Sequence, residues 1–169
     1  MNASAKNVPY QLRMNSSGFT LIELMVTIAV LAIIVGIAAP SFNTQIANQR
    51  VKSTAINIES ALKEAKAESI IRRQNVTVTY NNTLNTITLT GRNSTVIATY
   101  NVNSKSIVSQ DIMPPTVTQV VFQPNKLISG ASTEVVYTIC DSGSSNETPR
   151  QVRINSIANV SITNAGSCQ

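Results

Sequence analysis

Histidine and tryptophan are missing from this chain of 169 residues, and only two cysteines are present. Imidazole is a common general base and the commonest metal ligand, so its absence excludes histidine-based catalysis and the usual zinc sites. Two cysteines are also too few to close a tetrahedral metal site. The length allows one ordinary domain and little more.

Charged residues are scarce as well. They make up 12% of the chain, about half of what is typical of soluble domains. Serine, threonine and asparagine take their place and supply about a third of all residues. The formal net charge of +5 is moderate and spread along the chain, so the composition alone does not indicate a nucleic-acid partner.

The second half of the chain offers few groups for catalysis. Its carboxylates form no recognisable constellation, and they lie at Asp111, Glu134, Asp141 and Glu147. The glycines are scattered and form no loop that could cradle a phosphate. We therefore predict that the protein is not an enzyme and that it holds no cofactor and no metal.

One long apolar run is present. Residues 19–39 read FTLIELMVTIAVLAIIVGIAA and contain one charge, Glu23. At about 1.5 Å per residue, a helix of this length spans roughly 31 Å, which matches a bilayer core. A cleaved secretory signal is the alternative, but its apolar stretch is usually about 7–15 residues long. The run therefore predicts a transmembrane helix that stays in the protein.

Glu23 is the unusual residue of this run. A carboxylate inside an apolar helix is costly unless it is paired, and such a residue is a functional hypothesis by default. Alternatively, in an isolated monomer Glu23 would lie close enough to the cytoplasmic interface to reach water, and its charge would then need no partner. The residues alone leave both interpretations open.

Beyond the apolar run, a helical pattern continues to about Arg73. Apolar residues recur in steps of three to five, at Phe42, Ile46, Val51, Ala55, Ile58, Leu62, Ala65 and Ile70. Pro40 cannot donate a hydrogen bond to the carbonyl of Gly36, and its ring crowds that turn. We therefore predict a helix kink between Gly36 and Pro40.

From residue 75 on, the period of the apolar residues changes to two. Runs rich in Thr, Val and Ile predict strands over residues 75–80, 84–90, 95–102, 117–123, 134–140, 151–155 and 160–163. Pro114 and Pro115 separate the first three strands from the rest. The expected fold class is α+β, with a long amino-terminal helix packed through its outer half on an antiparallel sheet or two.

Residues 17–24, SGFTLIEL, resemble the class III signal of type IV pilins and type II secretion pseudopilins. In that family a prepilin peptidase cuts after the glycine on the cytoplasmic side, and the new amino terminus is methylated. The resemblance assigns the cut to Gly18 and the methylation to Phe19. It also gives Glu23 a partner, the free amine of Phe19 on a neighbouring subunit during filament assembly. Lys6 and Arg13 of the leader would remain cytoplasmic.

The second half resembles the β-domain of the GspH/FimT group, which contains type II secretion pseudopilin H and the minor pilin FimT. The matching segments are residues 122–124, 136–141 and 149–156. The resemblance implies a minor pilin or pseudopilin that primes or caps a type II secretion pseudopilus or a type IV pilus. It divides the chain into a leader (1–18), a transmembrane helix (19–39), a periplasmic continuation of the helix (40–73) and a GspH-like β-domain (74–169).

The same resemblance implies a location and a set of partners. The protein would cross the bacterial inner membrane once, with its amino terminus in the cytoplasm and its β-domain in the periplasm, before it joins a filament. Its partners would be other pilins or pseudopilins, the prepilin peptidase and the inner-membrane assembly platform.

Cys140 and Cys168 both fall in the domain that we expect outside the cytoplasm, where disulfides persist. A bridge between them would close a loop of about 28 residues and add roughly 3.5 kcal/mol in the chain-entropy model. Two unrelated free thiols are the alternative. We predict the bridge, because it would also hold the carboxy-terminal tail.

DNA is the alternative partner. Some FimT proteins bind DNA for natural transformation through an arginine-rich stretch with a Gly-Arg-x-Arg motif. Arg150 and Arg153 match the first basic positions of that stretch, but at the motif this chain reads Ala158-Asn-Val-Ser161. Arg150 and Arg153 are an odd interval apart, so on a strand they would point to opposite faces. DNA binding for uptake in transformation therefore stays as an alternative hypothesis.

Overall fold

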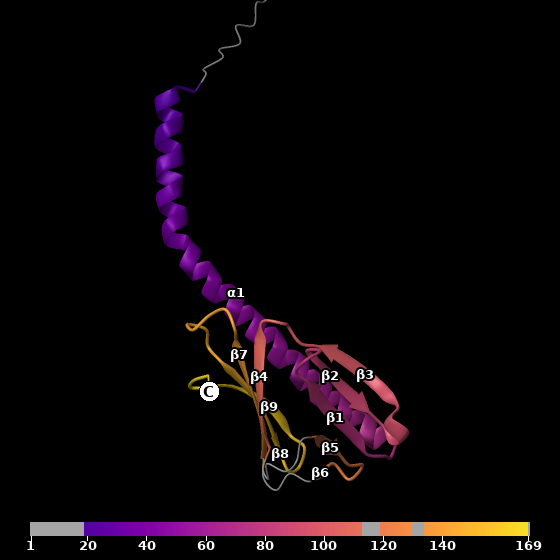
Figure 1. Ribbon diagram of the computed structural model, residues 1–169. Helices are drawn as coiled ribbons and strands as arrows, with labels where there is room; N and C mark the ends of the chain where they lie inside the picture. The colour runs from indigo at the N-terminus through magenta and orange to yellow at the C-terminus, as the bar shows by residue number, and fades with distance from the viewer. Residues whose placement is uncertain (1–18, 113–118, 130–133, 169) are drawn as a thin grey trace, which may run out of the picture. The chain divides into compact units, whose positions relative to one another are not determined.

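The computed structural model describes residues 19–112, 119–129 and 134–168, and of residues 39 and 40 it describes the backbone alone. The chain divides into two compact units, residues 1–39 and residues 40–169. The described part contains one long helix, nine strands and a short 3-10 helix (Figure 1). Gly18, Pro114 and Pro115 lie outside the described residues.

The helix α1 covers Leu21–Ile71, and it ends close to Arg73, where the helical pattern of the sequence ends. Arg73 follows it in the left-handed region, with φ 53°, and the Gln74 N–H donates to the carbonyl of Ser69 at 3.2 Å. This hydrogen bond pattern is that of a Schellman cap, which satisfies carbonyls that the helix end leaves open. The helix therefore ends where the strand pattern begins.

In the first unit, α1 is apolar on all sides. Residues Leu21–Ala38 have a mean hydropathy of 2.7, and none of this stretch is buried within the chain. By length and composition the segment can cross a membrane. A helix that is apolar all round needs an apolar surrounding, such as lipid or other helices.

The second unit contains two antiparallel sheets. The first has the strand order β3-β2-β1-β5-β6 and the second has the order β4-β7-β8-β9. The strands of the first sheet are β1 (Val76–Asn81), β2 (Thr86–Thr90), β3 (Val96–Asn101), β5 (Val120–Phe122) and β6 (Ile128–Ser129). Those of the second are β4 (Ser106–Ile112), β7 (Glu134–Asp141), β8 (Arg150–Asn155) and β9 (Val160–Asn164).

A single apolar core joins the helix to both sheets. The residues that α1 contributes are fully or almost fully buried, and they are Val51, Ala55, Ile58, Ala61, Leu62 and Ala65. Phe122 of the first sheet and Ile139 of the second belong to the same cluster. The alanines of α1 let the strands approach the helix closely, while Ile58 and Leu62 fill the space between them. The predicted α+β fold class is confirmed.

Hydrogen bonds from α1 to the strands and loops fix the register of this packing. Thr54 and Ser106 join their hydroxyls at 2.8 Å in the buried region, and Asn57 donates to the carbonyl of Asn101 at 3.0 Å. The Tyr100 hydroxyl donates to Glu64, and this bond, together with burial, raises the pKa of Tyr100 to about 12. Both sheets are thus tied to the same helix through polar as well as apolar contacts.

The structure departs from the sequence pattern in three places. Phe42, Ile46 and Ile70 belong to the apolar stripe of the helix, yet they are exposed. The strand β4 was not predicted, because its core-facing positions include the buried Ser106 and the half-buried Gln110, which break the apolar alternation. The short strand β6 was not predicted either.

Replacing Leu62 by Ala should destabilise the protein by about 2–5 kcal/mol, because Leu62 is fully buried and the change leaves a cavity. Ile56→Ala is the matched control, since Ile56 lies on the same helix with 44% of its surface exposed. We expect it to change stability by less than about 1 kcal/mol. Urea unfolding followed by circular dichroism measures both, and equal losses for the two variants would contradict the assigned core.

Candidate functional site

The amino-terminal end of α1 carries two of the predicted site residues, Phe19 and Glu23. Phe19 precedes the helix and is 80% exposed. The Thr20 hydroxyl accepts a hydrogen bond from the Glu23 N–H at 3.3 Å. Thr20 and Glu23 have the spacing of a capping box, in which a Thr cap is followed three residues later by Glu. The same residues therefore start the helix and place Glu23 in its first turn.

Glu23 has a favourable place for a carboxylate within the chain, since the amino end of a helix carries partial positive charge. Its immediate neighbours on the helix are exposed apolar side chains, among them Leu21, Ile22, Leu24 and Met25. The structure therefore presents Phe19 and Glu23 together, at one end of an exposed apolar segment. Gly18, the predicted cleavage residue, lies outside the described residues.

Gly36 and Pro40 lie inside α1, whose helical backbone continues through both positions. The space beside Gly36 is open, because a Cβ built there would meet no atom within 4 Å. The side chain of Pro40 is not among those described. The kink between these residues therefore stays a prediction.

The two cysteines form a disulfide, as predicted, with their Cα atoms 6.0 Å apart. Cys140 lies near the end of β7, and Cys168 lies in the tail after β9. A backbone hydrogen bond from Ala165 to Pro149, at 2.9 Å, holds the same tail. The disulfide lines an open hollow of about 490 Å³ between the tail and the loop of residues 142–149.

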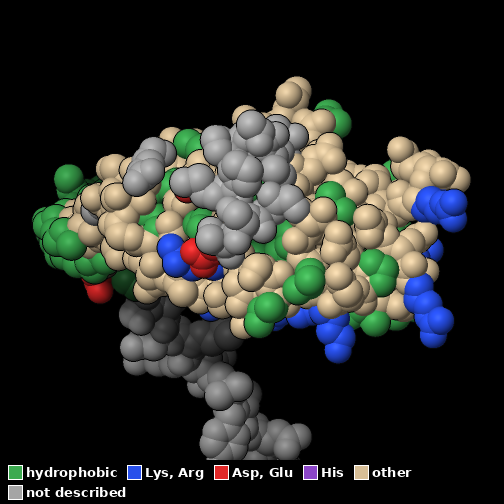
Figure 2. Space-filling view, turned by 90° about the horizontal axis from the view of Figure 1, so that it is seen from below, with side chains coloured by type: hydrophobic (Ala, Val, Ile, Leu, Met, Phe, Trp, Pro, Cys, Tyr) green, Lys and Arg blue, Asp and Glu red, His purple; other side chains and the backbone are tan. Residues whose placement is uncertain are grey.

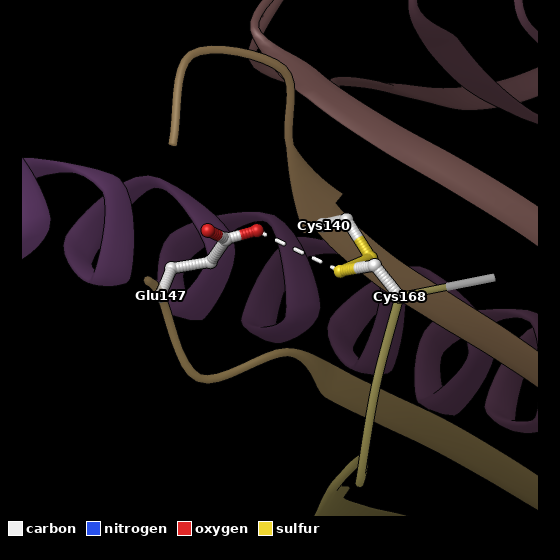
Figure 3. A group of neighbouring side chains, drawn as sticks. All are labelled: Cys140, Glu147 and Cys168. Carbon is white, nitrogen blue, oxygen red and sulfur yellow. Dashed lines mark hydrogen bonds between the residues drawn. A yellow bond between two sulfur atoms is a disulfide. The ribbon is translucent and has the colours of Figure 1, made fainter. Parts of the chain in front are cut away.

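Figure 3 shows Glu147 beside this disulfide. Its Oε1 atom is 3.6 Å from Cys168 Sγ and accepts a hydrogen bond from the Asp141 N–H at 3.1 Å. A disulfide sulfur carries no proton, so the dashed line of the figure marks a contact rather than a donated hydrogen bond. Cys140, Glu147 and Cys168 have ligand-type atoms within 4.8 Å of one another. In the bonded state neither sulfur is a thiolate, so the group offers a metal only one charged ligand.

The ion pair between Arg50 and Asp141 anchors the same loop to α1. The Arg50 Nε–H donates to Asp141 Oδ2 at 2.6 Å, and its terminal N–H donates to Oδ1 at 2.9 Å. The carboxylate is fully buried, whereas 21% of the Arg50 side chain is exposed. At the other end of the loop, the Thr148 N–H donates to Asn48 Oδ1 at 2.7 Å.

The hydrogen bonds from Arg50 lower the pKa of Asp141 below its usual range. Burial acts in the opposite direction, while a hydrogen bond from the Gly143 N–H and the nearby charges of Arg50 and Lys105 also lower the pKa. The Asp141-Ser-Gly143 turn could have been recognised in the sequence as an Asx turn. Its partner Arg50 could not, because 91 residues separate the two.

The two arginines considered for DNA do not form one site. Val152 and Ile154 of β8 are buried. The alternation of the strand therefore places Arg150 on the same face as these two residues and Arg153 on the opposite, outer face. Arg153 lies 3.4 Å from Glu134 and donates to Gln151 Oε1 at 3.3 Å. Its charge is therefore shared with a carboxylate of the neighbouring strand.

Two family models match the sequence. The prokaryotic N-terminal methylation motif matches residues 13–39. The model of the type II transport protein GspH matches residues 54–158, which is more than half of the chain. A search of curated proteins finds no match. The resemblance inferred from residues 17–24 and from the second half is thereby confirmed.

Solved structures of similar fold include a type IV minor pilin and a minor pseudopilin of a Type 2 Secretion System. The type IV minor pilin FimU of Pseudomonas aeruginosa (strain PAO1) has a TM-score of 0.58 and 14% identity, over 72% of this chain and 96% of that one. The minor pseudopilin EpsH from the Type 2 Secretion System of Vibrio cholerae has a TM-score of 0.55 and 12% identity, over 70% of this chain and 99% of that one. At such identities the likeness shows the fold alone.

Replacing Asp141 by Asn should lower stability at neutral pH, because Arg50 loses its charged partner. The folded-state pKa of Asp141 is depressed, so its contribution is present above the unfolded pKa, near 4, and is lost as pH falls through the folded pKa. The stability difference between wild type and variant should therefore shrink below about pH 4.

Urea unfolding from pH 7 to pH 2 measures this difference. Asp111→Asn is the matched control, because Asp111 is an exposed strand residue. We expect its difference from wild type to be small throughout. A pH-independent difference for Asp141→Asn would contradict the role assigned to the ion pair.

Proposed function

The chain belongs to the GspH family of type II transport proteins, a family of minor pilins and pseudopilins, and from this premise we propose that it primes or caps a filament. The observation that supports this role most directly is the exposed apolar segment of α1 with Phe19 and Glu23 at its start. The methylation motif over residues 13–39 covers the same segment. Such a segment needs a partner surface, and a filament core of packed helices supplies one.

The methylation motif and the apolar helix fit a membrane-anchored pilin. We propose that the amino terminus lies in the cytoplasm, where the prepilin peptidase cuts between Gly18 and Phe19. The unit of residues 40–169 would then lie in the periplasm, which agrees with its disulfide, because disulfides persist in oxidising compartments.

Assembly would exchange one apolar surrounding for another. In the membrane, side chains such as Leu21, Leu24 and Leu31 face lipid, and in the filament they would face helices of other subunits. This exchange changes the hydrophobic free energy little. The pairing of polar groups would therefore set the position that each subunit takes in the filament. The carboxylate of Glu23 and the amine of Phe19 on a neighbouring subunit would form that pair, because an unpaired charge in an apolar surrounding is costly.

The family consists of structural pilins, and we propose that this chain is likewise not an enzyme. Its partners would be other pilins or pseudopilins and the inner-membrane assembly platform. The similar structures belong to a type IV pilus and to a Type 2 Secretion System, so the fold fits both machines. DNA capture through Arg150 and Arg153 is not part of our proposal, because Arg153 pairs with Glu134 and Arg150 lies on the other face.

Replacing Glu23 by Ala should leave membrane insertion intact and reduce incorporation into filaments, because the neighbouring amine loses its partner. Glu23→Asp is the control, since it keeps the charge and should keep most of the incorporation. Co-purification with the other subunits after shearing or cross-linking measures the effect. Normal incorporation of Glu23→Ala would refute the pairing.

Replacing Gly18 by Val should block processing, because a bulky side chain would occupy the position of the cleavage glycine. The precursor of 18.1 kDa should then accumulate in the membrane fraction. Gly36→Ala is the control within the helix, where open space receives the new methyl group and processing should continue. Mass spectrometry of the amino terminus distinguishes the precursor from the mature chain. A Gly18→Val chain that still matures would show that the cut does not follow Gly18.

A further inference from the structure

The two halves of the disulfide differ in their access to solvent. Cys140, in β7, has 6% of its surface exposed, whereas Cys168, in the tail, is exposed. A disulfide is exchanged when a thiolate attacks one of its sulfurs, and access decides which sulfur is attacked. The open hollow of about 490 Å³ between the tail and the loop of residues 142–149 gives a small thiol room to reach the disulfide. Attack is therefore expected at Cys168 Sγ, with Cys140 as the sulfur that leaves.

Glu147 lies beside the sulfur that would be attacked. Its Oε1 atom is 3.6 Å from Cys168 Sγ, and Figure 3 shows the carboxylate at the Cys168 end of the disulfide rather than at the Cys140 end. The hydrogen bond from the Asp141 N–H, at 3.1 Å, holds the same oxygen in this place. An attacking thiolate approaches in line with the bond that breaks, so it must come close to this carboxylate.

The charge of Glu147 is not balanced by a nearby cation. Among the described residues that line the hollow, the charged ones are Asp141 and Glu147, and Asp141 pairs with Arg50. None of the ion pairs of the described residues includes Glu147, and its Oε2 atom is buried without a hydrogen-bond partner among them. Charged residues make up only 12% of the chain, and acidic side chains are few and scattered on the face that Figure 2 presents. One carboxylate therefore dominates the potential at the hollow.

The opposite direction of attack is unfavourable as well. A thiolate that attacked Cys140 would have to enter beside Ile107, which faces Cys140 across the β4–β7 pair and lines the same hollow. Cys168 would then leave as a thiolate next to the Glu147 carboxylate, and like charges at such a distance repel. The route through Cys168 Sγ is therefore the one that the structure leaves open.

We infer that the disulfide of Cys140 and Cys168 is a thiol-exchange site that opens at Cys168, and that Glu147 selects thiols without a negative charge near the sulfur. In the first step the thiolate sulfur bonds to Cys168 Sγ, the bond between the two cysteines breaks, and its electron pair leaves on Cys140 Sγ, which takes a proton from water. A second thiolate then attacks the added sulfur and releases Cys168, which is protonated in turn. The two thiols are oxidised to one disulfide, and the two cysteines are reduced.

This selection concerns the tail that the disulfide holds. Small anionic thiols would leave the tail in place, whereas a thiolate in cationic surroundings, on a small molecule or on a partner protein, would release it. The inference does not rest on the role of the chain in a filament, because Cys140, Glu147 and Cys168 all belong to the unit of residues 40–169.

The test compares the rates at which three thiols open the disulfide of the full chain in detergent micelles. The thiols are 2-mercaptoethanesulfonate, which is anionic, 2-mercaptoethanol, which is neutral, and 2-mercaptoethylamine, which is cationic. Glu147→Gln removes the charge and keeps an oxygen that can accept from the Asp141 N–H. Each rate is expressed as the ratio of variant to wild type, so the intrinsic reactivity of each thiol cancels.

The expected ratios follow from Coulomb's law in water. A thiolate about 5 Å from the carboxylate is slowed about fourfold, and a second charge of the thiol about 8 Å away changes the rate by a further factor of about two. Glu147→Gln should therefore accelerate opening about eightfold for the anionic thiol, about fourfold for the neutral one and about twofold for the cationic one. Salt at about 1 M should bring all three ratios close to one, because it screens the charges.

Glu59→Gln is the matched control, since it removes a carboxylate of α1 that pairs with Lys63, and it should leave all three rates unchanged. Thermal unfolding of each variant separates a lost charge from a loosened fold. Equal acceleration with the three thiols, or ratios that salt does not change, would show that Glu147 acts through its shape and would overturn the selection by charge.

The site of attack is tested in the same reactions. Samples are quenched early with acid, the free thiols are alkylated, and peptide mass spectrometry locates the added thiol. We expect the added thiol on Cys168 and the alkyl group on Cys140. The reverse distribution, or an equal one, would overturn the assignment of Cys168 as the sulfur at which the disulfide opens.

Discussion

Burial of one face of α1 between residues 47 and 69 is the constraint on which the unit of residues 40–169 depends. Leu62 and Ile58 belong to the same apolar cluster as Phe122 of the first sheet and Ile139 of the second. Either sheet alone would leave an exposed apolar face, which the helix covers in both cases. Because one helix serves both sheets, a change at its buried face affects the whole unit.

The distribution of apolar side chains around α1 changes along its length. Up to Ala38 its side chains are apolar on all sides, and beyond Ala47 they are apolar mainly where they meet the sheets. Ile56, Ile70 and Ile71 are exceptions, exposed on the helix away from the core. The first part therefore suits packing with lipid or other helices, whereas the second part packs against both sheets of the unit of residues 40–169.

The loop of residues 142–149 is held by three different kinds of bond. The disulfide joins its start to the tail, the ion pair with Arg50 joins Asp141 to α1, and Asn48 accepts from the Thr148 N–H. A loop rich in Ser and Gly has high conformational entropy when free, so these bonds offset a considerable ordering cost. The loop is thereby held both to α1 and to the carboxy-terminal tail.

The sequence by itself determined the features that depend on neighbouring residues. These are the apolar span, the methylation motif with Glu23, the start and end of α1 and most strands, because periodicity and capping are local properties. It also indicated the pairing of Cys140 with Cys168, since two cysteines allow one bridge. Only the tertiary structure decided the partner of Asp141, the strand β4 and the burial of one helix face against both sheets. Those depend on which distant segments the chain path brings together, and no local pattern records that path.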